Sequence, residues 1–150
     1  MSNRLRLNVL GAFETLDSNG ENIDFAHRKA QALLAYLAIE RSRPQSRDHL
    51  ATLLWARTGE ERARHNLRQA LSKLRTLCSD LVECPGDRIA LNSKVCVVDA
   101  ATFGELSQSD DLDNLDLALK LYRGDLLEGY SAREPEYQEW LEIARGRLRR

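Results

Sequence analysis

The residues best suited to chemistry in this chain lie between Glu60 and Cys78, in the run EERARHNLRQALSKLRTLC. At about 100° of turn per residue, the apolar residues of this run share one stripe of a helix: Ala63, Leu67, Ala70, Leu71, Leu74, Leu77 and Cys78. The opposite side carries hydrogen-bonding residues flanked by cations: His65, Gln69, Ser72 and Thr76, with Arg62, Arg68, Lys73 and Arg75 beside them. Phosphates attract cations, and base edges in a major groove bind Arg, Lys, Gln and Ser. The run therefore predicts a helix with one face in a core and the other suited to duplex DNA.

The charge of the chain is unevenly distributed. The net charge is −1, but residues 1–98 hold 15 basic and 11 acidic residues, whereas residues 99–150 hold 7 and 12. Within residues 28–75 the basic residues outnumber the acidic ones by 11 to 4. This pattern favours a basic footprint joined to an acidic module. The competing interpretation is that the arginines are solvated surface residues, with Arg64 paired to Glu60 or Glu61 within the helix.

Composition sets broad bounds on the class of protein. The 150 residues are enough for one domain or two small ones, and 43% hydrophobic with 30% charged residues is ordinary for a globular protein. No apolar run is long enough to span a bilayer, so we expect no membrane association. Three cysteines without a CxxC pair favour a reduced, cytoplasmic setting, in which they serve as small buried hydrophobes. The nucleotide-binding and hydrolase motifs GxGxxG, GxSxG and HExxH and the P-loop are absent, which predicts no enzymatic activity, no cofactor and no metal.

The elements that position this helix begin with strands and continue with helices. Alternation predicts strands over residues 5–9, 13–16 and 22–25, which together form a small antiparallel sheet. Helical periodicity follows over residues 30–38. Ser46 is placed to cap a second helix that ends near Trp55, and the T-x-x-E pattern from Thr58 predicts a capping box that starts the third helix near Gly59. Two helices joined by a short turn, the second with a basic face, form a helix-turn-helix arrangement.

A hairpin and a helical region complete the chain. Residues 81–84 and 88–91 read as strands around Pro85-Gly86-Asp87, forming a wing beside the basic helix, and residues 95–98 as another strand. Asp99 is expected to cap a helix that runs to about Leu106, and residues 110–114 to form a loop. A further helix buries Leu115, Ala118, Leu119 and Tyr122. The last helix starts near Glu136, places Tyr137 and Trp140 in the core of a second domain, and lacks a stop signal, which suggests the N-terminal piece of a longer protein.

Ordered segments of the chain resemble one family of bacterial regulators. The segments are LRLNVLGAFE, RKAQALLAYLA, SRDHLATLLW, ERARHNLRQALSKLR, VDAATF, LALKLYRGDLLEG and EYQEWLE. Together they resemble the antibiotic-regulatory-protein (SARP) type of transcriptional activator. The resemblance implies an α+β fold: an OmpR/PhoB-type winged helix-turn-helix over residues 1–98, with an N-terminal antiparallel sheet and a C-terminal hairpin. It further implies that residues 99–150 begin a helical, tetratricopeptide-like bacterial transcriptional activator domain, which is truncated here.

The resemblance also assigns roles to residues. Its major-groove positions match His65, Arg68, Gln69, Ser72 and Lys73, and its backbone contacts match Arg62, Arg64, Arg75 and Thr76. Its minor-groove wing residue matches Arg88, next to an unfavourable Asp87. Ser46 and Arg47 add backbone N–H groups and a cation for a phosphate.

Two functions follow from these observations. The first is sequence-specific binding of promoter DNA by a regulator, with two copies side by side on tandem direct repeats and, by the resemblance, activation through RNA polymerase. The second is a protein-interaction module that works through the acidic helical C-terminal third, with the winged helix as a docking platform.

Overall fold

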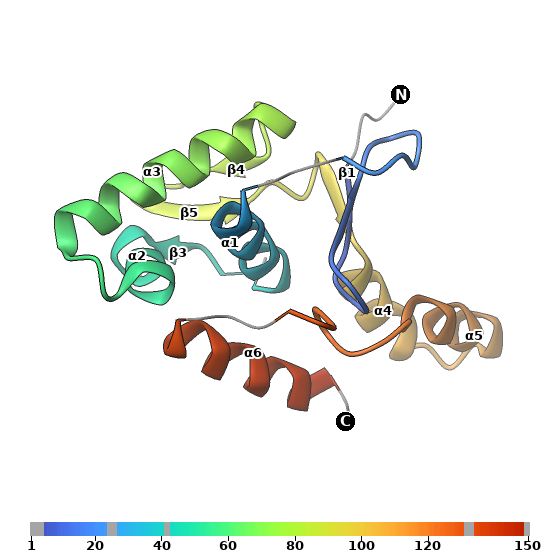
Figure 1. The fold of residues 1–150 in the computed structure, drawn as a ribbon. Helices are drawn as coiled ribbons and strands as arrows, with labels where there is room; N and C mark the ends of the chain where they lie inside the picture. The colour runs from blue at the N-terminus through green and yellow to red at the C-terminus, as the bar shows by residue number, and fades with distance from the viewer. Residues whose placement is uncertain (1–4, 24–26, 41–42, 131–133, 149–150) are drawn as a thin grey trace.

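The chain is a mixed α/β protein of helices and two small sheets (Figure 1). The computed structural model describes residues 5–23, 27–40, 43–130 and 134–148. The elements in chain order are β1 (Leu5–Asn8), β2 (Glu14–Leu16), α1 (Arg28–Ile39), β3 (Gln45–Ser46), α2 (Arg47–Trp55), α3 (Glu60–Leu77), β4 (Val82–Glu83), β5 (Arg88–Leu91), β6 (Cys96–Val98), α4 (Asp99–Ser107), α5 (Leu112–Leu121) and α6 (Pro135–Leu148).

The N-terminal sheet is antiparallel only in part. Its order is β2-β1-β6; β1 pairs with β2 antiparallel, as predicted, but the other neighbour of β1 is β6, which runs parallel to it. The third strand predicted over residues 22–25 is reduced to a single bridge between Asn22 and Leu16, and residues 24 and 25 lie outside the described residues. One neighbour of β1 is therefore a strand that lies far away in the sequence, β6. The alternation of apolar and polar residues along a sequence does not specify which strands pair.

The three central helices form where periodicity predicted them, but one predicted cap is absent. The Ser46 hydroxyl accepts a hydrogen bond from the His49 N–H at 3.0 Å, which confirms the cap of α2. The prediction of a capping box at Thr58 is wrong. The N-cap of α3 is Gly59, which has a φ of 83° and no side chain to cap the helix. The Thr58 hydroxyl instead donates to the Trp55 carbonyl at 2.9 Å. Gly59 tolerates this left-handed conformation at low cost, so α3 still begins at the expected point.

The second sheet contains the predicted hairpin. β4 and β5 pair antiparallel, with Val82 opposite Leu91 and Glu83 opposite Ala90, and β3 pairs with the other edge of β5. Gly86 has a φ of 62° in the turn between β4 and β5. β3 runs directly into α2, so this sheet ties the hairpin to the start of that helix.

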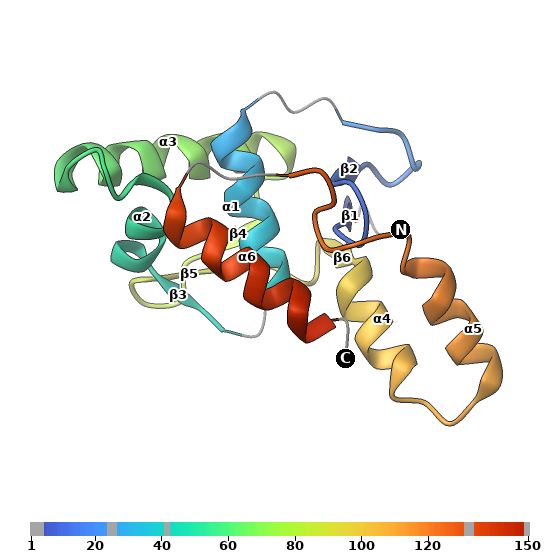
Figure 2. The same ribbon diagram turned by 60° about the horizontal axis from the view of Figure 1, so that its bottom comes forward.

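Helices α1 and α2 lie between α3 on one side and α6 on the other (Figures 1 and 2). Tyr137 of α6 is fully buried, and its hydroxyl donates to the Ala32 carbonyl of α1 at 2.7 Å. The ring of Trp140 meets that of Tyr36 on α1 edge-on, with centroids 4.6 Å apart. The expectation that Tyr137 and Trp140 form the core of a separate second domain is thus wrong, because both aromatic side chains complete the core around α1.

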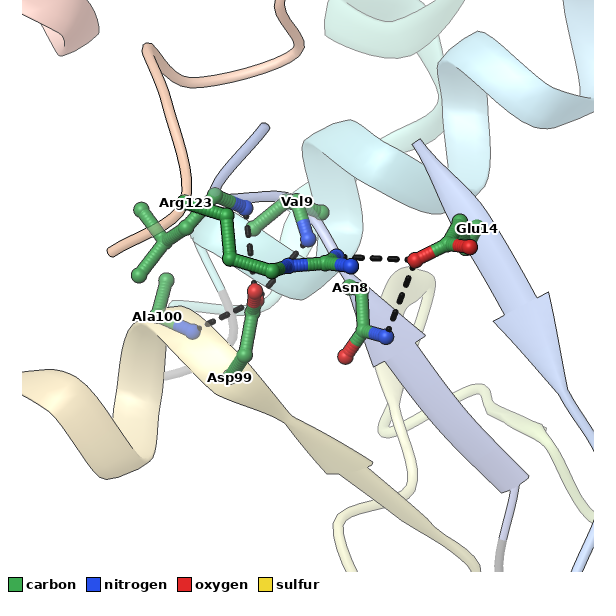
Figure 3. A network of polar contacts seen from close by, with 7 residues as sticks. Asn8, Val9, Glu14, Asp99, Ala100 and Arg123 are labelled. Carbon is green, nitrogen blue, oxygen red and sulfur yellow. Dashed lines mark hydrogen bonds and ion pairs between the residues drawn. The ribbon is translucent and has the colours of Figure 1, made fainter. Parts of the chain in front are cut away.

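A polar seam joins the start of α4 to the end of β1 (Figure 3). The buried Asp99 carboxylate accepts hydrogen bonds from the N–H groups of Val9 at 2.8 Å and Leu10 at 3.0 Å, and also from its neighbour Ala100 at 2.8 Å. The N-cap of α4 is Val98, so Asp99 is the first helical residue rather than the predicted cap. Beside it, the Arg123 guanidinium pairs with Glu14 at 2.8 Å. Asp99 therefore satisfies two backbone donors of a distant segment together with one at the start of its own helix.

The acidic segment after α4 is shorter than the predicted loop over residues 110–114. α5 already begins at Leu112, because the Asp111 carboxylate caps it by accepting from the Asp113 N–H at 2.9 Å. The sequence pattern predicted Leu119 on the buried face, but α5 instead packs through Ala118, its only fully buried residue, and Leu119 is 70% exposed. Helices α4 and α5 form a hairpin at the end of the molecule away from α3 in both views (Figures 1 and 2).

Candidate nucleic-acid interface

The polar residues predicted on the outward side of α3 are all exposed. They are Arg62, Arg64, His65, Arg68, Gln69, Ser72, Lys73, Arg75 and Thr76. The opposite stripe is buried in the core and consists of Ala63, Leu67, Ala70, Leu71 and Leu74. Only Leu77 and Cys78, at the end of the predicted stripe, are half-buried. The amphipathic division of α3 therefore follows the sequence pattern over almost its whole length.

The exposed arc of α3 has an ordered composition. At about 100° per residue, neutral hydrogen-bonding side chains hold its centre and cations hold its two edges. His65, Gln69, Ser72 and Thr76 form the centre. Arg64, Arg68 and Arg75 form one edge, while Arg62 and Lys73 form the other. Such a face suits duplex DNA, because hydrogen-bonding side chains can read base edges, and cations can contact base edges or neutralise phosphates.

The start of α2 and the hairpin tip lie against one edge of this arc. Arg64 and Arg68 of α3, Arg47 of α2 and Asp87 of the hairpin line one hollow of about 370 Å³, together with Ser46, Asp48 and Leu67. Three arginines on one hollow at a helix N-terminus make a surface that attracts an anion, because the N-terminal end of the helix dipole is also positive. Asp48 and Asp87 oppose this attraction from the same hollow.

Arg64 is partly engaged by carboxylates of the protein. Its Nη2 lies 3.6 Å from Asp48 Oδ1 and 3.9 Å from Glu60 Oε1, so the predicted intrahelical pair with Glu60 does form. All three side chains are more than half exposed, and exposed ion pairs of this kind contribute at most about 1 kcal/mol. A phosphate could therefore displace either partner at small cost.

Cys84 on the hairpin lies close to two arginines, Arg75 and Arg47. Its Sγ lies 3.5 Å from Nη2 of Arg75 on α3 and 3.8 Å from Nη2 of Arg47 on α2. Cys84 is exposed, so the expectation of three buried cysteines holds only for Cys96; Cys78 is half-buried. The sequence analysis did not predict the contacts of Cys84 with Arg47 and Arg75. The position of Cys84 beside the Pro85-Gly86 turn did indicate that it lies at the tip of the hairpin.

Arg88 is exposed but turned away from the tip of the hairpin. Its Nη1 donates to the Pro44 carbonyl at 3.4 Å, which holds the guanidinium near the entry to β3. The structure thus brings Arg47, Arg64, Arg68 and Arg75 together around the hairpin and α2, whereas the Arg88 guanidinium lies at the Pro44 carbonyl, just before β3.

Other kinds of site have little support among the residues that the structure describes. Within those ranges no group of three or more His, Cys, Asp and Glu is placed to hold a metal ion. No helix of the described chain has the length and apolar character needed to cross a membrane.

Comparisons with known proteins place the fold. No protein-family model matches the chain, and neither does any curated protein. Among solved structures, the chain is similar to Mycobacterium tuberculosis EmbR in complex with a low affinity phosphopeptide, with a TM-score of 0.72 and 23% sequence identity. The match covers 97% of this chain and 42% of the EmbR chain, so this chain spans about two fifths of the length of that structure. At this identity the likeness shows that the two share a fold.

Proposed function

We propose that this chain is a transcriptional regulator of the SARP kind that binds duplex DNA sequence-specifically, with α3 in the major groove. The observation that carries the proposal is the exposed arc of α3 from Arg62 to Thr76, in which every side chain is a cation or a neutral hydrogen-bonding group. The start of α2 flanks that arc with a further cation, Arg47. The ordered motifs of the sequence and the fold shared with EmbR support the same assignment.

In this proposal residues 1–98 form a winged helix-turn-helix. Helices α2 and α3 are its helix pair, and the β4–β5 hairpin is its wing. Residues 99–150 are the first part of a helical activator domain, and they brace the DNA-binding part through α6 and Asp99. Activation, and contact with RNA polymerase, belong to this proposal through the family resemblance.

The contacts divide into two classes. His65, Arg68, Gln69, Ser72 and Lys73 are proposed to face base edges, where Arg to guanine and Gln to adenine are favourable pairs. Arg62, Arg64, Arg75, Thr76, Ser46 and Arg47 are proposed to hold phosphates. Arg88 is the weakest member, because its guanidinium already donates to Pro44. Two copies on tandem direct repeats, rather than on a palindrome, complete the proposal.

Selection of bound duplexes from a random DNA pool, at two salt concentrations, tests the proposal. We expect an enriched, repeated motif whose binding weakens as salt rises, because each phosphate contact releases counterions. Uniform binding without an enriched motif would contradict sequence-specific recognition. Loss of binding even at low salt would contradict DNA binding as a whole.

A pair of variants then assigns the surface. Arg68→Ala removes a proposed base contact and should weaken binding to the selected duplex by roughly ten- to a hundredfold, or about 1–3 kcal/mol. Lys94→Ala is the matched control, because Lys94 is an exposed cation in the turn between β5 and β6. Equal affinities of the two variants would exclude α3 as the recognition surface.

The competing function is a protein-interaction module that uses the C-terminal third. Its specific support is that α5 exposes Leu112, Leu117 and Leu119 among acidic residues. Tight binding to a protein partner, combined with no affinity for DNA at low salt, would favour this function over the first.

A further inference from the structure

Lys29, near the start of α1, is a cation that contacts two other segments of the chain. Its Nζ donates a hydrogen bond to the Leu54 carbonyl in the last turn of α2 and forms an ion pair with Glu134, just before α6. The same ammonium lies 5.6 Å from the centroid of the Trp55 ring, which adds a cation–π contact. Leu54 and Glu134 are 25 and 105 positions away in the sequence, so no local pattern predicted these contacts.

The Leu54 carbonyl lies where α2 gives way to the turn that leads into α3. In a longer helix the Thr58 N–H would bond this carbonyl, but here it donates to the Trp55 carbonyl at 3.2 Å. The ammonium of Lys29 instead satisfies the Leu54 carbonyl, at the negative end of the helix dipole. Since α3 begins at Glu60, a few residues farther along the chain, Lys29 holds the point from which the turn to α3 departs.

Glu134 connects the same ammonium to the C-terminal region. Its side chain is 20% exposed and immediately precedes α6, which lies against α1 and α2 (Figure 1). α6 is in turn fixed on α1, because the Tyr137 hydroxyl donates to the Ala32 carbonyl. A polar path therefore runs from the start of α6 through Glu134 and Lys29 to the end of α2.

A second ion pair joins α1 and α6 at their other ends. Arg147 Nη2 of α6 lies 3.9 Å from Oε1 of Glu40, the C-cap of α1. Glu40 comes eleven residues after Lys29, which is roughly 16 Å along the helix axis. This pair provides a comparison in which a contact between α1 and α6 is lost far from the end of α2.

We propose that Lys29 is a positioning residue for DNA recognition: held by Glu134, it fixes the end of α2 and thereby the orientation in which α3 meets the groove. The inference rests on the proposed function, in which α3 reads base edges. Hydrogen bonds to base edges weaken steeply with changes of distance and angle, whereas the attraction of cations to phosphates tolerates small displacements. Loss of Lys29 should therefore weaken binding to the selected duplex more than binding to a random duplex.

Lys29→Met tests this role, because it removes the ammonium and keeps a long, flexible side chain. The ratio of affinities for the selected and the random duplex should fall by about tenfold or more, the value of one good base contact. A variant that is merely less stable binds both duplexes less by the same factor, because only the folded fraction binds, and its ratio stays unchanged. Circular dichroism establishes that each variant is folded at the temperature of the assay.

Three further variants isolate the path through Glu134. Arg147→Met is the matched control, since it removes a cation that pairs between α1 and α6 at their other ends, and its affinity ratio should equal that of the wild type. Glu134→Ala should lower the ratio by about two- to fivefold, because Lys29 keeps its acceptor on Leu54 but loses its ion pair. The double variant Lys29→Met/Glu134→Ala should match Lys29→Met alone, because Glu134 acts through the ammonium.

Hydrogen exchange of backbone amides in the free chain tests the contact without DNA. In Lys29→Met, the amides of residues 58–64 should exchange at least about tenfold faster than in the wild type, because the start of α3 opens locally more often. Arg147→Met should leave the exchange of these amides unchanged.

Other outcomes would overturn the proposal. Unchanged exchange at residues 58–64 in Lys29→Met would mean that the ammonium does not hold the start of α3. Faster exchange with an unchanged affinity ratio, in a chain whose wild type selects a motif, would assign Lys29 to stability alone. An equal fall of the ratio in Arg147→Met would mean that any loosening of α6 has this effect. A wild type that selects no motif would defeat the proposed function and recognition through Lys29 together, while faster exchange in Lys29→Met would still establish the contact with α2.

Discussion

Helices α3 and α5 are both amphipathic and both lie at the surface, yet they expose opposite chemistries. α3 buries all but one of its leucines fully and exposes cations and hydrogen-bonding groups, whereas α5 buries Ala118 and exposes Leu112 and Leu119 on a helix that also carries Asp113 and Asp116. The two helices also lie at opposite ends of the molecule (Figure 1). An exposed cationic helix suits a polyanion, and an exposed leucine stripe suits an apolar surface.

The difference follows from what each helix packs against. α3 lies on α1 and α2 and contributes its apolar stripe to the main core. α5 contacts mainly α4, a helix of nine residues whose only fully buried residue is Asp99. A single short neighbour offers too little apolar surface to cover every leucine of α5. The number of leucines in a helix thus does not reveal how many of them are buried.

The largest expected contrast concerns stability. Leu74→Ala on α3 removes a side chain with 0% exposure and should lower the free energy of unfolding by about 3 kcal/mol, the usual cost of a cavity. Leu119→Ala on α5 should change it by less than about 0.5 kcal/mol, because the side chain is already exposed. Urea denaturation of the two variants measures both values. Similar losses would show that Leu119 is packed in solution, which contradicts an unpartnered stripe.

The next contrast separates two kinds of residue on α3. Gln69→Ala, at the centre of the exposed arc, should relax the preference at one base pair of the selected duplex by about 1–3 kcal/mol. Lys73→Ala, closer to the edge, tests whether that residue reads a base or holds a phosphate. A phosphate role would weaken all sequences equally and lower the salt slope by about one. Affinities for single-base variants of the duplex at several salt concentrations distinguish a base contact from a phosphate contact. An unchanged base preference in Gln69→Ala would show that the centre of the arc does not recognise bases.

A smaller effect concerns the seam that joins the two regions. Burial raises the pKa of Asp99 above its ordinary value of 3.8, although the N–H groups of Val9, Leu10 and Ala100 partly offset this. Because the pKa in the folded state is the higher one, the stabilisation from this group is complete below about pH 4 and is lost as pH rises through the folded pKa. The stability of the wild type relative to Asp99→Asn should therefore fall as pH rises from about 3 to 6. Urea denaturation of both proteins across this pH range measures the difference in their free energies of unfolding. An increase in the stability of the wild type relative to Asp99→Asn with rising pH would contradict the prediction.

Local periodicity was enough to predict the exposed and buried faces of α3. The apolar spacing from Ala63 to Leu74 repeats over several turns, and no competing element disturbs it. The cap of α2 at Ser46 was equally accessible, because the hydroxyl and the N–H that it bonds are three residues apart. Both features depend on residues that are close in sequence.

Features that depend on distant residues were not predictable in this way. The strand pairing of β1 with β6 and the hydrogen bonds of Asp99 with Val9 and Leu10 join residues about 90 positions apart. The contact of Cys84 with Arg47 likewise crosses 37 positions. Even a local motif failed at Thr58: its hydroxyl donates to the Trp55 carbonyl, and Gly59 is the N-cap of α3. Sequence patterns specify which residues are apolar or can cap a helix. Which strand or side chain each of them contacts depends on the packing of the whole chain.

The smallest expected effect lies at the edge of the α3 arc. Asp48→Asn removes the carboxylate that lies 3.6 Å from Arg64 and lines the same hollow as Arg47 and Arg68. Loss of this charge releases Arg64 from one of its two carboxylate partners and removes a repulsion from an incoming phosphate, so affinity for the selected duplex should rise by about two- to fivefold, within the range of one exposed ion pair. The gain should shrink at high salt, because both terms are screened. Asp116→Asn on α5 makes the same change of charge far from α3 and should leave single-site affinity unaltered. If Asp116→Asn gave an equal gain, the effect would come from net charge alone, and the hollow beside Arg64 would not be a phosphate site.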